Sequence, residues 1–264
     1  MIEEFMLIAN ETVAAHAFSM GFPLIYRVHE TPDKTKLADL NAFLNTLGYG
    51  MKNVGNVKAQ TFQRILQKAK GTKEENVVNR VVLRTMKKAR YAPECLGHFG
   101  LAAPCYCHFT SPIRRYPDLM VHRILREILR GEMTKERIDV YGEKLAEIAQ
   151  HCSEREVAAM EAERAADDLK KCEYMQTRIG TVETGIISGV AQYGFFVQLS
   201  NTVEGMVRVS SIAGDFYVCD MKNYRMVGRN SKRVFRLGDP VRVRVASVDL
   251  ENSNVDFELI SSAN

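Results

Sequence analysis

Residues 105–123 read CYCHFTSPIRRYPDLMVHR and concentrate three arginines, two histidines and two prolines in one short segment. Proline fixes its backbone φ and has no amide hydrogen, so the loop between Pro112 and Pro117 is predicted to be stiff. Ser111 lies just before this loop and is a residue type that caps helix starts. Arginine binds phosphate oxygens with two parallel hydrogen bonds. The segment therefore predicts a phosphate-binding turn, followed by a helix over residues 119–129.

The composition excludes two classes of protein. Of the 264 residues, 46% are hydrophobic and 26% are charged, which is typical of folded domains and not of disordered chains. No apolar run approaches the roughly eighteen residues of a membrane-spanning helix, and the first residues do not form a signal peptide. The length allows one large domain or two ordinary ones. We expect a cytoplasmic monomer with no membrane partner.

The six cysteines are expected to be reduced thiols, because nothing in the sequence indicates secretion. Five soft ligands lie close together in the sequence, with the spacing C-x-x-H-x6-C-x-C-H. This spacing is not a standard structural zinc pattern, so zinc stays a minor alternative and no metal ligand is predicted. The five residues are Cys95, His98, Cys105, Cys107 and His108.

Positive charge is concentrated near the C-terminus. The formal net charge is only +4, but residues 222–244 contain eight Lys and Arg residues against one acid, Asp239. A segment this basic indicates a polyanion such as nucleic acid as the partner. A solvated charged surface is the alternative.

Helical periodicity dominates up to about residue 178. Helices are predicted over residues 33–46, 59–70, 74–91 and 135–175, with an extended segment over 22–30. A further helix is predicted within residues 1–21, before these. It places one apolar stripe toward the expected core: Ile2, Phe5, Met6, Ala9, Val13 and Ala17.

From Ile179 the pattern changes to alternation, with Gly- and Asn-rich turns. Five short strands in about 85 residues predict a small OB-type barrel, so we divide the chain into residues 1–178 and 179–264. In GVAQYGFFVQL, strict alternation puts Tyr193 and Phe195 on one face and Phe196 on the other. A glycine between aromatics permits a bulge or a close backbone approach, which would let Tyr193 and Phe196 share a surface. Such aromatics stack nucleobases or fill the barrel core.

The strands resemble the S1-type RNA-binding domain in residue types and spacing. The similar stretches are G-x-V, YGFFV, VEGMVRVSSI and GDPVRVRVASVDLENSNVDFEL. The resemblance implies that Tyr193, Phe196 and Arg208 contact RNA, with Arg208 in place of the usual histidine. Asn254 falls where the family carries a basic residue, so no contact is assigned to it.

The helical part resembles the C-terminal half of the ribonuclease II/ribonuclease R catalytic domain, called the RNB domain. The similar stretches are MIEEFMLIANETVA, YRVHETPDKTKLADLNAFLNTLGYG, HFGLA and HFTSPIRRYPDL. The implied fold class is α+β, in which a partial, mostly helical RNB domain precedes a five-stranded S1 barrel. The implied activity is processive 3′→5′ hydrolysis of single-stranded RNA to nucleoside 5′-monophosphates, with magnesium as the cofactor.

The same resemblance implies roles for individual residues. Arg114 is expected to act near the scissile phosphate, and Arg115 and Arg123 to contact the RNA backbone. Alternatively, Arg115, His122 and Arg123 pair with acids on the long helix. Glu4 matches an acid that touches the ribose near the RNA 3′ end, or is an ordinary solvated glutamate. No role is assigned to Tyr26, Arg27 and His29, while Tyr116 and Asp118 are interpreted as packing and capping residues.

Magnesium-assisted hydrolysis needs several converging carboxylates, which the family supplies from an aspartate cluster in the first half of its catalytic domain. The sequence contains no such cluster, and the pair Asp167–Asp168 is predicted to lie on a helix surface. The first helix also lacks a capping residue. These observations predict a fragment that binds RNA without cleaving it, with the metal-binding half missing or supplied in trans. The alternative is a stand-alone S1-type RNA-binding protein with a helical scaffold.

Overall fold

The computed structural model describes residues 1–72 and 74–262, and its contacts divide the chain into two compact units. The helical unit comprises Met1–Leu40, Met51–Gln67 and Val82–Ala159. The barrel unit comprises Asn41–Gly50, Lys68–Val81 and Met160–Asn264, so it contains parts of several helices as well as the predicted barrel.

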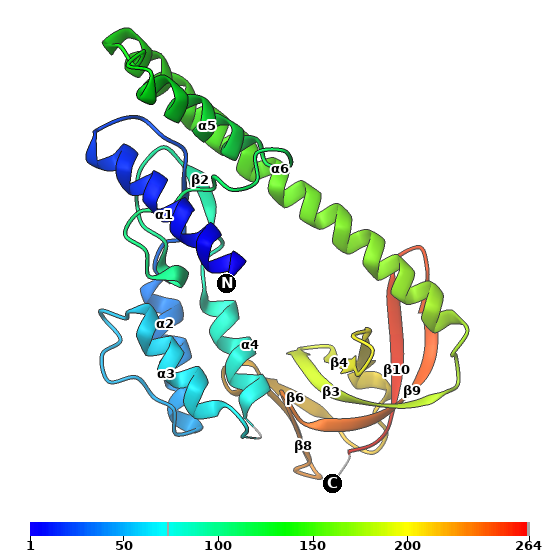
Figure 1. Ribbon diagram of the computed structural model, residues 1–264. Coiled ribbons are helices and arrows are strands. Elements are labelled where there is room, and N and C mark those ends of the chain that lie inside the picture. The colour runs from blue at the N-terminus through cyan, green and yellow to red at the C-terminus, as the bar shows by residue number, and fades with distance from the viewer. Residues whose placement is uncertain (73, 263–264) are drawn as a thin grey trace. The chain divides into compact units, whose positions relative to one another are not determined.

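Long helices and two short paired strands build the first part of the chain (Figure 1). Their order follows the predicted pattern closely. The elements are α1 Ile2–Ser19, β1 Tyr26–Val28, α2 Lys34–Thr46, α3 Ala59–Ala69, α4 Glu75–Thr85, β2 Arg90–Ala92, η1 Phe99–Leu101, α5 Tyr116–Leu129 and α6 Lys135–Gln176.

The apolar stripe predicted for α1 is partly wrong. The side chains that α1 buries are Asn10, Ala14 and Ala17, whereas Ile2 and Phe5 are 77% and 65% exposed. Ala14 and Ala17 pack with residues of β1, β2 and α5 in the core of the helical unit. The first turns of α1 extend past this core, so their apolar side chains find no cover among the described residues.

Helix α4 ends at Thr85, six residues before the predicted end at residue 91. The chain then becomes extended, and β2 pairs antiparallel with β1, with Tyr26 opposite Ala92. This pairing buries Tyr91 and satisfies backbone groups that a continued helix would have used internally.

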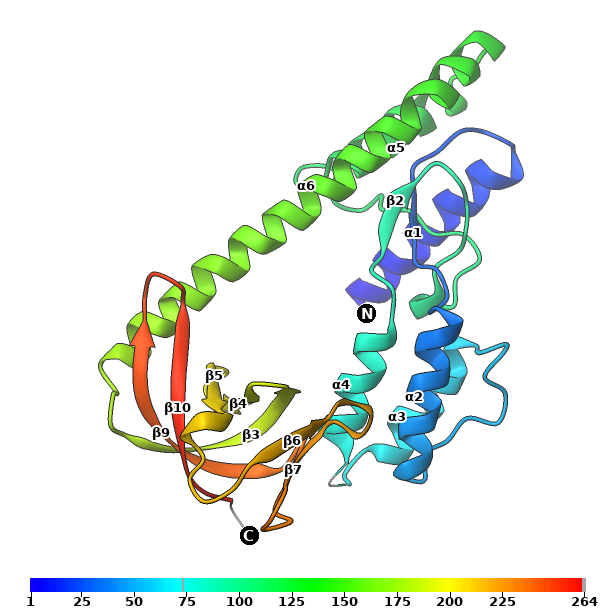
Figure 2. The ribbon, with the colours of Figure 1, turned by 180° about the vertical axis from the view of Figure 1, so that it is seen from behind.

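The predicted five-stranded barrel is confirmed. Its strands close in the order β10-β5-β4-β3-β9, and Figure 2 shows them from behind. Alternation of the side chains fills the barrel interior. Strand β9, for example, buries Val241, Val243 and Val245 and turns the residues between them outward. The strands are β3 Val182–Ala191, β4 Gly194–Leu199, β5 Glu204–Arg208, β9 Pro240–Asp249 and β10 Asn254–Ser262.

A second, three-stranded sheet was not predicted, and its strands lie between β5 and β9 in the sequence. It is formed by β6 Tyr217–Asp220, β7 Arg225–Gly228 and β8 Val234–Arg236. Asp215 organises the β7–β8 turn, because its carboxylate accepts hydrogen bonds from the backbone amides of Asn230 and Ser231.

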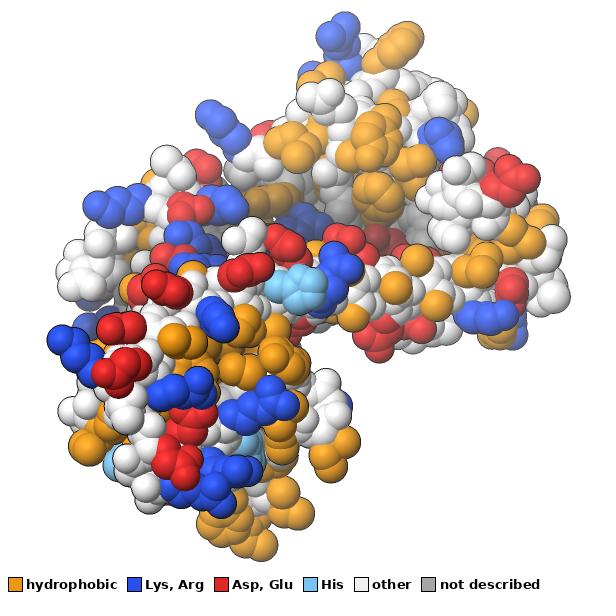
Figure 3. Space-filling view, turned by 90° about the horizontal axis from the view of Figure 1, so that it is seen from above, with side chains coloured by type: hydrophobic (Ala, Val, Ile, Leu, Met, Phe, Trp, Pro, Cys, Tyr) orange, Lys and Arg blue, Asp and Glu red, His pale blue; other side chains and the backbone are white. Residues whose placement is uncertain are grey.

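The basic residues of segment 222–244 lie on this sheet, in the turns beside its strands, and on β9. Arg225 and Arg244 pair with Asp220 and Glu258, whereas Arg229, Arg236 and Arg242 are exposed to solvent. Acidic, basic and hydrophobic side chains are interspersed over the face shown in Figure 3. These three arginines are therefore accessible to a polyanion.

Candidate nucleic-acid interface

The candidate RNA-binding face begins at a close approach between β4 and β5. Gly194 lies opposite Arg208 in the antiparallel register, and a Cβ atom at position 194 would collide with the backbone carbonyl of Val207. Glycine is therefore required where β4 starts. Tyr193 lies in the turn just before the strand. The direction of its ring is therefore not set by the alternation of side chains along β4.

This arrangement separates the three aromatic residues. Tyr193 is 61% exposed and Phe196 is half-buried, and their ring centroids lie 6.5 Å apart in an edge-to-face arrangement. Phe195 is fully buried and stacks on Phe235. Tyr193 and Phe196 thus share a surface as predicted, while the strict grouping of Tyr193 with Phe195 is wrong. The bulge lies in β3, between Ile187 and Gly189.

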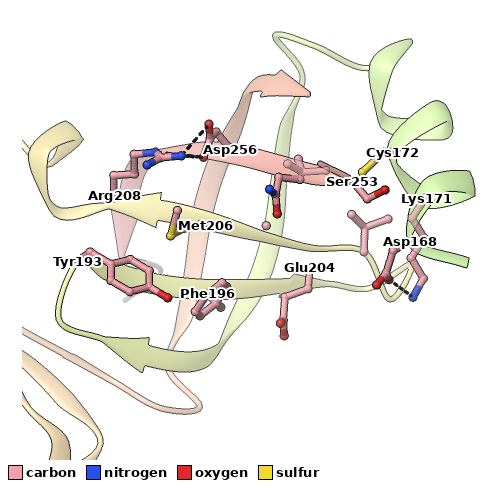
Figure 4. A pocket seen from close by; sticks show the side chains of 14 residues that line it. Asp168, Lys171, Cys172, Tyr193, Phe196, Glu204, Met206, Arg208, Ser253 and Asp256 are labelled. Atoms are coloured by element: carbon pink, nitrogen blue, oxygen red, sulfur yellow. Dashed lines mark hydrogen bonds and ion pairs between the residues drawn. The ribbon is translucent and has the colours of Figure 1, made fainter. Parts of the chain in front are cut away.

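Three strands place the remaining polar groups beside these rings. Phe196 on β4 lies opposite Met206 on β5, and Met206 lies opposite Asp256 on β10. Two residues further along β5, Arg208 reaches the Asp256 carboxylate at 3.2 Å (Figure 4). The resulting groove has a volume of about 330 Å³, and Asn254 also lines it.

The ion pair between Arg208 and Asp256 is exposed to solvent, so another anion can replace Asp256 as the partner of Arg208. The Arg208 side chain is 57% exposed, and exposed ion pairs typically contribute only about 0–1 kcal/mol. A phosphate group can therefore compete with Asp256 for the guanidinium group. The groove combines two accessible rings with two cations, Arg208 and Lys171, each paired with a carboxylate, a combination suited to a single nucleic-acid strand.

A second candidate site is the SPIRR turn, residues 111–115. The Ser111 carbonyl accepts hydrogen bonds from the amides of Arg114 and Arg115, which closes the turn. Asp118 is fully buried, and its Oδ1 accepts from the Ser111 amide at 2.8 Å and from Arg115 Nη2 at 2.7 Å. Asp118 thus ties the turn to the first turn of α5.

Several predictions for this segment need correction. Ser111 does not cap α5, because the N-cap position is Arg115. Asp118 does anchor the helix start, but Tyr116 is 50% exposed and does not pack into the core. Arg115 pairs with Asp118 of α5, and not with an acid on α6.

Other predicted residues of the helical unit occupy different environments. Arg114 and Arg123 are exposed, and Glu4 is exposed in the first turn of α1. His122 bonds to the Phe109 carbonyl at 2.8 Å and stacks on the Phe109 ring, so it has a packing role. The structure brings Tyr193, Phe196 and Arg208 together, while Glu4, Arg114, Arg115 and Arg123 remain candidates placed by resemblance.

The YRVHE stretch supplies an anchor that the sequence did not reveal. Arg27 of β1 is largely buried and pairs with Glu156 of α6 at 2.6 Å, and its guanidinium group lies over the Tyr91 ring. Nothing in the local sequence links positions 27 and 156, so only the fold reveals this pair. It fixes β1 to α6 within the helical unit.

Two half-buried histidines of the helical unit, His98 and His108, have lowered pKa values. Burial, aided by the positive charge of Arg115, lowers the pKa of His108 to about 3. Burial and the neighbouring His29 lower the pKa of His98 to about 4. The ring of His108 accordingly forms a hydrogen bond with the Tyr91 hydroxyl at 2.9 Å.

No metal centre is formed by the residues that the structure describes. Within residues 1–72 and 74–262, no three His, Cys, Asp or Glu side chains lie close enough together to hold an ion. The described carboxylates therefore do not fit the magnesium that the family resemblance implies. In the same residues, no helix has the length and apolar character needed to cross a membrane.

Replacing Asp118 by alanine is expected to destabilise the helical unit by about 3 kcal/mol, because it leaves Arg115 without its buried partner. Asp118→Asn keeps an acceptor for the Ser111 amide and should lose less. Thermal melting of both variants measures the difference. A melting temperature of Asp118→Ala equal to that of the unaltered chain would show that the pair does not hold the turn.

Comparison with known families identifies two domains along the chain. Residues 1–131 match the RNB domain, and residues 176–260 match the S1 RNA binding domain. The chain therefore belongs to the family of RNB-domain proteins, and it carries an S1 domain after its RNB segment.

Within this family the chain is similar to ribonuclease R. It is 48% identical to ribonuclease R of Aquifex aeolicus over 262 residues, which are 98% of this chain and 37% of that protein. Ribonuclease R of Mycoplasma genitalium in complex with ribose-methylated single-stranded RNA matches 98% of this chain and 41% of that chain, with 30% identity and a TM-score of 0.91. The same enzyme with double-stranded RNA matches over the same shares, with 28% identity and a TM-score of 0.80. The chain spans little more than a third of the Aquifex relative's length.

Proposed function

We propose that this chain supplies the RNA-binding barrel and the SPIRR turn of a 3′→5′ exoribonuclease of the ribonuclease R type. The substrate is single-stranded RNA, and the products are nucleoside 5′-monophosphates. The groove formed by Tyr193, Phe196 and Arg208 carries the proposal, because it offers stacking surfaces and a cation on one face. The Mycoplasma genitalium relative in complex with single-stranded RNA supports it.

In this proposal the SPIRR turn acts on the phosphate that is cleaved. Arg114 projects from a turn that two backbone hydrogen bonds and Asp118 hold in place. A guanidinium group on a rigid support stabilises the negative charge that develops on phosphate oxygens during cleavage, at little reorganisation cost. Arg115 holds the turn through Asp118, and Arg123 contacts the RNA backbone nearby.

The intact enzyme is proposed to use magnesium held by carboxylates outside residues 1–264. The described residues do not form a site for this metal. In this proposal, different residues bind the RNA and hold the metal for bond cleavage. The barrel groove needs only residues of this chain, whereas hydrolysis needs groups from elsewhere.

The purified chain is therefore expected to bind single-stranded RNA and to leave it intact in magnesium-containing buffer. Fluorescence anisotropy with a labelled oligonucleotide measures binding, and separation of the products on a gel measures cleavage. An Arg114→Ala preparation is the control for contaminating nucleases. Release of mononucleotides that requires magnesium and disappears in Arg114→Ala would contradict the proposed division. Failure to bind RNA would contradict the proposed function of the barrel.

A further inference from the structure

Two thiols of the helical unit lie in direct contact. The Sγ atoms of Cys95 and Cys105 are 2.6 Å apart, and both residues are free cysteines. Cys95 is half-buried, and Cys105 is buried at 8% exposure. Among the described residues no other two sulfur atoms are paired in this way, and the nearby Cys107 donates instead to the Asn10 carbonyl.

The backbone holds the two cysteine segments in register, so the contact does not depend on side-chain rotation alone. Strand β1 bonds to both segments, since the Arg27 amide donates to the Tyr106 carbonyl and the His29 amide donates to the Gly97 carbonyl. An antiparallel bridge between His98 and Ala103 joins the segments directly. Forming a covalent bond between the sulfurs therefore requires no large backbone movement.

We propose that Cys95 and Cys105 are a thiol pair that oxidises slowly to an intramolecular disulfide when the protein meets hydrogen peroxide. The half-buried Cys95 thiol loses its proton, and the thiolate attacks one oxygen of hydrogen peroxide. The O–O bond breaks, the leaving hydroxide takes up a proton to become water, and Cys95 becomes a sulfenic acid. The Cys105 sulfur then attacks the Cys95 sulfur and releases a second water. The two thiols lose two electrons, and the peroxide gains them.

The surroundings of the Cys95 thiol make this oxidation slow. Burial and the hydrogen bond with Cys105 raise the pKa of the Cys95 thiol, so little of the reactive thiolate is present at neutral pH. Once Cys95 is oxidised, contact with Cys105 favours the disulfide over further oxidation. The disulfide would close the loop formed by residues 95–105, which precedes the SPIRR turn in the sequence.

Peptide mapping of the full chain tests this proposal without any substitution. After hydrogen peroxide treatment, alkylation and digestion without reductant, we expect a linked peptide pair joining Cys95 to Cys105, while the other four of the six cysteines are alkylated. The link should raise the melting temperature by about 5 °C, and a reductant should reverse the shift. Alkylation of both cysteines after peroxide, a link to another cysteine, or sulfinic acid on Cys95 without a link would overturn the proposal.

Two variants localise the effect. Cys95→Ser and Cys105→Ser should each abolish the peroxide-induced rise in melting temperature. Cys219→Ser is the matched control, because Cys219 is also half-buried but lies in the barrel unit, and this variant should retain the full rise. A rise that persists in Cys95→Ser would show that another site is oxidised.

Discussion

Arg114→Ala should lower the rate of mononucleotide release about 10²- to 10³-fold, the loss seen when one rigid donor to a developing anion is removed. The measurement uses a hybrid enzyme in which this chain replaces the matching 262 residues of Aquifex aeolicus ribonuclease R. The expected loss is large because the turn that carries Arg114 is held in place by hydrogen bonds to Ser111 and Asp118, so the guanidinium group is preorganised.

Two further substitutions make the Arg114 test specific. Arg114→Lys keeps the charge but not the planar fork, so its rate should fall between those of the unaltered hybrid and the alanine variant. Arg126→Ala removes an exposed arginine near the end of α5, and should leave the rate unchanged. An Arg114→Ala hybrid that binds RNA and releases mononucleotides at the unaltered rate would remove Arg114 from the proposed chemistry.

Phe195→Ala should destabilise the barrel by about 3–5 kcal/mol, the usual cost of deleting a fully buried aromatic side chain. Phe195 is 0% exposed and stacks on Phe235 at a centroid distance of 5.1 Å. Phe196→Ala should cost clearly less, because its ring is half-buried beside the groove. Hydrogen exchange of the β3, β4 and β5 amides reports barrel stability separately from that of the helical unit. Equal losses in the two variants would contradict the assignment of Phe196 to the binding face.

Much of the fold could be predicted because its elements are long and periodic. The buried valines 241, 243 and 245 mark β9 by alternation alone, and the length of α6 follows from its uninterrupted helical pattern. The sheet of β6, β7 and β8 escaped prediction because its strands have only three or four residues, too few for a period to show. The end of α4 was misplaced because pairing with β1 overrides local helix preference.

The candidate sites were predictable only in part. Resemblance to the S1 domain identified Tyr193 and Phe196, whereas strict alternation grouped Tyr193 wrongly, since the turn before Gly194 removes it from the strand. The partner of Arg208 could not be predicted, because Asp256 lies 48 residues away and reaches β5 only through the parallel pairing with β10. Contacts of this kind arise from the closed barrel and leave no local pattern.

The affinity of the Tyr193→Ala, Phe196→Ala double variant for single-stranded RNA tests the central claim most directly. Stacking contributes about 1–3 kcal/mol per base, so even one lost stacking contact should weaken binding roughly 5- to 150-fold. Hydrogen exchange of the barrel amides establishes that the variant remains folded, and anisotropy then gives its affinity. We predict a folded barrel with strongly weakened RNA binding. A folded double variant that binds as tightly as the unaltered chain would contradict the claim that this groove is the RNA-binding site.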